Sequence, residues 1–213
     1  MADVTLVSKK VKVEDSAEAI NRLYYEKGWT EGLPIVCPTE ERILAMLQYT
    51  DRAAQDVIAE IAPLYNAASI EKIAVNAIMA GCLPEYFPVV VAGVEAMAVK
   101  EFNLYGIQGT TNPACPAAIV NGPIARELEI NAGSNLLGQG RRSNATIGRA
   151  LRFVMMNIGG GTPGVVDKAT HGQPGKYTFC FAANEEDSPW EPLHVERGFA
   201  AETSTVTMVG VTG

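Results

Sequence analysis

The stretch from residue 138 to residue 164 constrains the fold of this 213-residue chain more than any other. It begins with the glycine-rich sequence GQGRRSNA, continues with apolar residues at helical spacing, and ends in NIGGGTPG, which cannot remain helical. The apolar positions are Ile147, Leu151, Val154, Met155 and Ile158. One face of this helix must be buried against other elements, which predicts a layered globular domain.

Capping residues and hydrophobic periodicity place further elements along the chain. Helices are predicted over residues 15–28, 40–50, 70–82, 84–99 and 144–158. Strands are predicted over residues 4–13, 56–63, 105–111, 115–124, 125–130, 176–183 and 204–211. The elements mix without regular β-α-β repetition. We therefore expect an α/β or α+β fold with helices packed on a mixed sheet, and neither a Rossmann fold nor a TIM barrel.

Residues 1–213 are expected to form a single domain, because this length suits one core. Residues 203–211 alternate like a strand, and the sequence then stops at Gly213 without a polar tail. Two interpretations stay open. The strand docks in the sheet as a terminal strand, or the chain is the N-terminal part of a longer or processed polypeptide, with a second fragment as its partner.

The overall charge excludes several classes of partner. The formal net charge is −7 and the isoelectric point is about 4.9, which disfavours binding to nucleic acid and to anionic membranes. No apolar run reaches the roughly 18 residues that a membrane span needs, and the N-terminus does not resemble a signal peptide. We expect a cytoplasmic protein with no nucleic-acid or membrane partner.

Four cysteines occur, and none forms a CxxC motif. In a reducing compartment they are expected to be free thiols, which most often serve as small core residues. Cys82 is the leading candidate for a catalytic thiol, because it precedes a helix that starts at Pro84, and a helix N-terminus can lower a thiol pKa. Cys180 is the second candidate. Asn76, polar within an apolar helix, is expected to need a hydrogen-bond partner.

The loop and helix start around residue 140 predict a site for a small anion. Backbone N–H groups at a helix N-terminus, together with guanidinium groups, favour negative charge. The predicted binding residues there are Arg141, Arg142, Ser143, Asn144 and Arg149, with Thr110 and Thr111 added from GTTNPAC. The alternative is a loop that only caps a core helix, with its arginines in solvent.

His194 and Glu196 are predicted to handle protons, because they would share one face of an extended segment. The chain has only two histidines and lacks HxH and HExxH spacing, so no metal site is assigned, and the sequence leaves the cofactor unknown. A weaker alternative is a zinc or iron–sulfur site built from Cys82, Cys115, Cys180 and His194.

Four motif blocks carry a resemblance to a bacterial family of unsettled function that is encoded near small UGSC-motif (seleno)proteins. The blocks are GWTEGLP, NAIMAGCLPEYFPV, NATIGRALRFVMMNIGGGTPG and SPWEPLHVERGF. The resemblance implies thiol or selenol redox chemistry and a polypeptide that continues past Gly213. Cys37 stands where such proteins are expected to carry proline, which makes it a poor candidate for catalysis.

Together these features predict an enzyme, or a catalytic subunit, that acts on a small anionic substrate through a cysteine thiol. Thiol-dependent oxidoreductase chemistry is favoured over a lyase or a hydrolase. The alternative from a different class is a non-catalytic subunit, in which the glycine-rich segments and the last strand contact a partner chain. Either function suits a homo- or hetero-oligomer.

Overall fold

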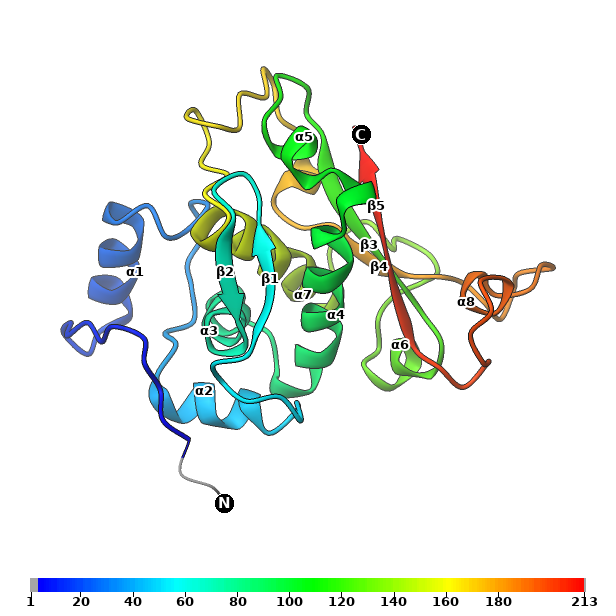
Figure 1. Cartoon of the computed structure of the whole chain (residues 1–213), viewed down its shortest axis with the longest axis horizontal. Coiled ribbons are helices and arrows are strands. Elements are labelled where there is room, and N and C mark those ends of the chain that lie inside the picture. The colour runs from blue at the N-terminus through cyan, green and yellow to red at the C-terminus, as the bar shows by residue number, and fades with distance from the viewer. Residues whose placement is uncertain (1–3, 213) are drawn as a thin grey trace.

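The computed structural model describes residues 4–212 and has an α+β architecture (Figure 1). Three helices that pack on one another form the centre of the core, namely α3 (Ile70–Ala80), α4 (Phe87–Ala98) and α7 (Arg142–Phe153). The other α-helices are α1 (Ala17–Glu26), α2 (Glu40–Leu47), α5 (Leu104–Gln108), α6 (Pro123–Glu127) and α8 (Leu193–Glu196). Short 3-10 helices occur at Pro84–Tyr86, Lys100–Phe102 and Pro174–Lys176. No helix within residues 4–212 is long and apolar enough to cross a membrane.

The strands form two separate sheets. An antiparallel hairpin joins β1 (Val57–Ile61) to β2 (Asn66–Ser69) and packs against α4 and α3. The second sheet has the order β4-β3-β5, from β3 (Cys115–Asn121), β4 (Cys180–Ala182) and β5 (Thr205–Val211). Strand β3 is parallel to β4 and antiparallel to β5, so the sheet is mixed as expected. Helix α4 covers β5, and α7 packs against β4.

The predicted central helices are confirmed. Ser69 caps α3 by accepting a hydrogen bond from the Lys72 amide, and Gly81 ends the helix with a positive φ of 95°. Helix α7 continues through a π-helical turn, Val154–Ile158. The apolar stripe predicted for this helix is buried, with each side chain at most 4% exposed. The stripe faces α3 and α4, which explains why this helix lies at the centre of the core.

Three predicted strands are wrong. Residues 105–111 begin within α5, because the Asn103 side chain accepts a hydrogen bond from the Gly106 amide and so starts a helix. Residues 125–130 follow Pro123, which starts α6 instead. Residues 4–13 form neither a helix nor a strand. The predicted processing after Gly213 concerns a residue outside the described range.

The two residues before strand β4, Thr178 and Phe179, approach α7 more closely than a side chain at position 148 would allow. A Cβ atom at Gly148 would overlap the Phe179 backbone and lie 2.5 Å from the Thr178 hydroxyl. That hydroxyl also donates to the Ala145 carbonyl at 2.7 Å. The glycine in the middle of α7 therefore fixes the distance between the helix and the sheet.

We expect Gly148→Ala to destabilise the fold by about 2 kcal/mol in urea unfolding, because overpacking costs more than the roughly 1 kcal/mol that alanine gains in helix propensity. Gly93→Ala is the matched control. Its Cβ would meet only the flexible end of Leu151, at 3.0 Å. Equal stability of the two variants would contradict the close approach of α7 and residues 178–179.

Candidate functional site

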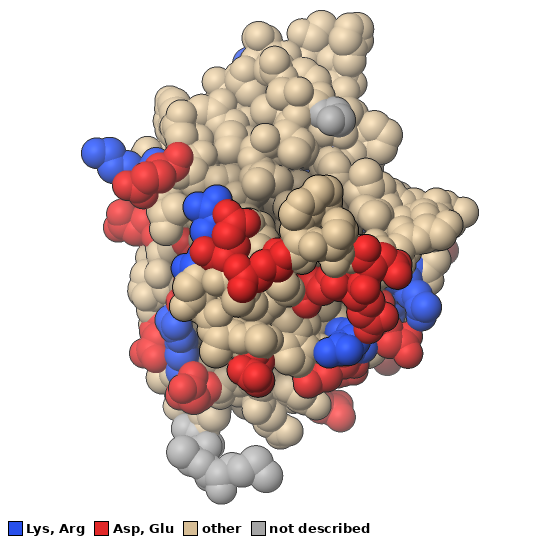
Figure 2. Space-filling view, turned by 90° about the vertical axis from the view of Figure 1, so that its right-hand side faces the viewer, with Lys and Arg blue, Asp and Glu red and all other residues tan. Residues whose placement is uncertain are grey.

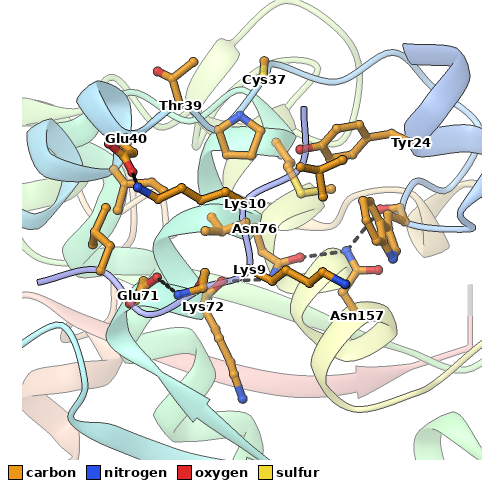
Figure 3. Close-up of a pocket in the computed structure, with 18 of the residues that line it drawn as sticks. Lys9, Lys10, Tyr24, Cys37, Thr39, Glu40, Glu71, Lys72, Asn76 and Asn157 are labelled. Atoms are coloured by element: carbon orange, nitrogen blue, oxygen red, sulfur yellow. Dashed lines mark hydrogen bonds and ion pairs between the residues drawn. The ribbon is translucent and has the colours of Figure 1, made fainter. Parts of the chain in front are cut away.

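A groove of about 890 Å³ runs along α3, on the side of the molecule that carries α1 and α2 (Figures 1 and 3). We call it the α3 groove. Its walls come from residues 6–13, α1 and Trp29, residues 37–43, α3, and the π-helical turn after α7. This volume lies in the range of about 300–1,000 Å³ that is usual for small-molecule sites.

The lining of the α3 groove is mainly apolar. The rings of Tyr24 and Trp29 meet edge to face, with centroids 5.3 Å apart. The aliphatic lining consists of Leu6, Val11, Val13, Leu23, Ile43, Val75, Met79 and Ile158. Burial raises the pKa of the Tyr24 hydroxyl, and nearby Cys37 raises it further, so the hydroxyl stays a hydrogen-bond donor at neutral pH. An apolar ligand with a polar end matches this lining.

Two asparagines supply polar groups on the floor of the groove (Figure 3). The buried Asn76 amide donates to the Lys72 carbonyl, and its oxygen accepts from the Asn157 amide at 2.8 Å. The Asn157 amide also donates to the Trp29 carbonyl, at 3.1 Å. Asn157 lies in the π-helical turn, a feature that often occurs at functional sites. Its side-chain oxygen accepts no hydrogen bond from residues 4–212 and is free for a ligand.

Three lysines border the groove, and the ammonium groups of two of them already contact other groups of the chain. Lys10 pairs with Glu40, and the Lys72 ammonium donates to the Ala67 carbonyl at 2.8 Å. In Figure 3 the Lys9 side chain points toward Asn157, and its ammonium makes neither an ion pair nor a hydrogen bond with the described residues. Lys9 and Lys72 both lack a carboxylate partner within residues 4–212, but the Lys72 ammonium is held by a backbone carbonyl, so Lys9 is the better candidate for contact with an anionic ligand.

The N-terminal wall of the groove is held by one buried carboxylate. Glu71, in the first turn of α3, is 1% exposed and accepts from the Val7 amide at 3.0 Å and the Ser8 amide at 2.8 Å. Gln55 donates to the same carboxylate at 2.7 Å. Burial alone would raise the Glu71 pKa, but these hydrogen bonds together outweigh it and lower the pKa.

A buried ion pair supports the loop that carries Trp29. The Arg149 guanidinium contacts Glu31 at 2.6 Å, donates to the Pro34 carbonyl at 2.8 Å, and lies over the Phe153 ring at 4.9 Å. Arg149 was predicted to orient a substrate. The structure instead places it between α7, the end of α3 and residues 31–34, with all its contacts inside the chain.

The other residues predicted to bind an anion are also bonded within the chain. Arg141 pairs with Glu129 at 2.9 Å, and Arg142 donates twice to the Gly81 carbonyl.

Neither Ser143 nor Asn144 caps α7. The Ser143 hydroxyl donates to the Glu129 carbonyl, and the Asn144 side chain bonds Asn131 and Leu136. The hollow beside them has about 450 Å³ and is lined by Glu85, Glu127 and Glu129 as well as the two arginines, which disfavours an anion.

The two predicted catalytic cysteines are buried near each other. Cys82 donates its S–H to the Thr146 carbonyl, and burial raises its pKa to about 12, although the Thr146 hydrogen bond and two arginines act in the opposite direction. Burial raises the pKa of the Cys180 thiol, and the nearby Cys82 raises it further. The expected lowering of the Cys82 pKa is therefore not found, because loss of solvent outweighs the helix N-terminus. Among the four cysteines, only Cys37 is partly exposed.

The carboxylate that lies beside His194 is not the predicted one. It is 3% exposed, with Nδ1 3.4 Å from Glu185 and Nε2 3.3 Å from the Ala201 carbonyl. Glu196 is exposed in the same short helix, α8, because that segment is helical rather than extended. Glu185 also accepts from Asn121 at 2.7 Å, so this cluster closes the end of β3.

The predicted site residues therefore fall into separate groups. Thr110 and Thr111 accept backbone hydrogen bonds from Lys168 and Thr170, and no hydrogen bond within residues 4–212 joins them to α7. The α3 groove contains none of the predicted site residues. Asn76 is the sequence feature that pointed to this groove. A polar side chain in an apolar helix needs a hydrogen-bond partner, and here that partner is Asn157 on the groove floor.

Within residues 4–212, no three His, Cys, Asp or Glu side chains come together as a metal site would require. A scan against protein-family models, a search of curated proteins and a search of solved structures each find no match to this chain. The resemblance in the motif blocks stays a prediction.

Exposure predicts which thiol reacts in the folded protein. We expect one thiol per chain to react rapidly with iodoacetamide, mapped to Cys37 by peptide mass. The buried Cys82, Cys115 and Cys180 should react roughly a hundredfold more slowly, because each needs local unfolding. Cys37→Ser is the control and should abolish the rapid phase. Rapid labelling of Cys82 or Cys180 would contradict this and restore them as catalytic thiols.

We expect Glu71→Gln to lower the free energy of unfolding by about 2 kcal/mol at neutral pH, because the amide places an N–H group against hydrogen-bond donors. The folded Glu71 pKa is lowered, so the carboxylate's contribution is present above the unfolded pKa of about 4.3 and is lost as pH falls through the folded pKa. Urea unfolding from neutral to acidic pH measures both effects. The control is Glu41→Gln, an exposed position. Identical acid dependence of wild type and Glu71→Gln would contradict the assignment.

Proposed function

We propose that the chain binds a small organic anion with an apolar body in the α3 groove, and that it does so as an enzyme or a catalytic subunit. One observation carries the proposal. The same groove holds an aromatic wall, formed by Tyr24 and Trp29, and the unpaired ammonium of Lys9. Small-molecule sites have this composition, a mainly apolar lining with a few polar groups that orient the ligand.

The polar groups narrow the chemistry of the ligand. An ammonium recognises a carboxylate, a sulfonate or a phosphate as a point charge. The Tyr24 hydroxyl can donate a further hydrogen bond, whereas the free oxygen of Asn157 accepts one. A ligand with an acidic group, a hydrocarbon body and a hydroxyl or amide donor satisfies all three residues.

The choice of the catalytic thiol follows from which cysteine is exposed in the groove. A cysteine that reacts with a bound substrate must meet it, and Cys37 is the thiol on the groove wall. We therefore transfer the role of redox or nucleophilic thiol from Cys82 and Cys180 to Cys37. Thiol-dependent oxidoreductase chemistry remains favoured over lyase or hydrolase chemistry because of the family resemblance, although that resemblance disfavours Cys37 as the catalytic thiol.

Ligand binding can be followed through Trp29. Trp190 is 80% exposed on a distant loop, so Trp190→Phe leaves Trp29 as the single tryptophan reporter. We expect anilinonaphthalene sulfonate to quench Trp29, and octanoate to displace it better than octanol does. Lys9→Met should weaken octanoate binding roughly fivefold, which corresponds to about 1 kcal/mol for one partly exposed charge pair.

Lys100→Met is the matched control, since it removes an exposed lysine at the end of α4, outside the groove, and should leave binding unchanged. Equal competition by octanoate and octanol, or equal effects of the two lysine variants, would contradict anion recognition by Lys9. Protection of Cys37 from iodoacetamide by octanoate would place the thiol beside the bound ligand.

A further inference from the structure

Strand β5 forms an open edge of the three-stranded sheet. One side pairs with β3 over all seven residues, Thr205–Val211, without a bulge. No strand within residues 4–212 pairs with its other side. None of its residues is fully buried. The strand therefore presents a row of backbone N–H and C=O groups that a further strand could pair with.

The sequence of this edge favours pairing. Proteins usually protect an open edge with lysine, proline or a bulge. TVTMVGV contains no charge and no proline, and four of its residues are β-branched on the face away from the core. Val206 and Met208 pack on the core, which leaves Thr205, Thr207, Val209 and Val211 on the opposite face.

The charge around β5 is distributed unevenly along the strand. The segment that leads into β5, residues 183–204, contains six carboxylates and one arginine. Figure 2 shows acidic side chains gathered on this side of the molecule, and a largely uncharged surface around the last residues of the chain. At the other end of β5, the loop that bonds Thr110 and Thr111 carries the exposed Lys168 and His171.

We infer that β5 pairs antiparallel with β5 of a second copy of this chain, across a two-fold axis, to give a continuous six-stranded sheet. Antiparallel pairing places the acidic segment of one copy near the Lys168 end of the other. Parallel pairing would bring the two acidic segments together. A two-fold axis also requires an isologous contact, which a self-complementary strand provides.

The register that pairs all seven residues sets Thr207 of each copy opposite Val209 of the other. Directly opposite side chains interact most strongly across an antiparallel pair, and like charges there are destabilising. The two positions can therefore be changed together to test the register. Because β5 lies away from the α3 groove, this inference stands independently of the proposed ligand (Figure 1).

The test is sedimentation equilibrium of the full chain over a wide range of concentration. We expect the wild-type chain to dimerise. The double variant Thr207→Lys/Val209→Lys should raise the dimer Kd about tenfold or more, because like charges then face each other in two pairs. Thr207→Lys with Val209→Glu places opposite charges in the same pairs and should dimerise more tightly than the double-lysine variant. Tyr25→Lys, at a position 66% exposed on α1 and away from β5 in Figure 1, should have no effect.

Thermal unfolding of each variant at low concentration shows whether its monomer folds. A wild-type chain that stays monomeric at every concentration would overturn the inference and leave the edge for a strand of another protein. A dimer that both double variants weaken equally would overturn the register. A dimer that the double-lysine variant leaves unchanged would place the interface elsewhere.

Discussion

The side of the molecule that carries the α3 groove depends on the Arg149 guanidinium. From α7 it reaches Glu31, the carbonyls of Leu33 and Pro34, and the Ala80 carbonyl at the end of α3. The side chains of Arg149 and Glu31 are 14% and 6% exposed. Removal of either partner would therefore leave the other as an unpaired charge that solvent barely reaches. Because this ion pair fixes the loop after α1, it also fixes Trp29, which Asn157 holds from the other side.

The sequence predicts the fold well where the determining signals are local. Helix α3 follows from a capping serine and a terminal glycine, and α7 follows from an apolar stripe that ends in glycines. Each of these signals acts within a few residues. Strand β3 follows from a short apolar run. The failed strands show the limit of such reasoning. Residues 4–13 alternate like a strand, yet their backbone N–H groups bond the Glu71 carboxylate, a partner more than sixty positions away.

The candidate site is less predictable because it depends on burial and on contacts between distant segments. The position of Cys82 before a helix indicates an activated thiol, but its surroundings exclude solvent and raise its pKa. His194 has an adjacent carboxylate in the sequence, whereas the fold supplies Glu185 instead. Asn76 gives the one usable signal, since its need for a partner leads to Asn157 and thus to the floor of the groove.

The core helices separate the two surfaces that we propose to be functional. Helix α3 forms the floor of the groove, and α4 packs against β5 on the opposite side. The side chains between them, including Ile73, Val90 and Phe153, are fully buried, and such interiors are close-packed. A ligand that fills a preformed groove needs no rearrangement of this core. Ligand binding and strand pairing should therefore be thermodynamically independent.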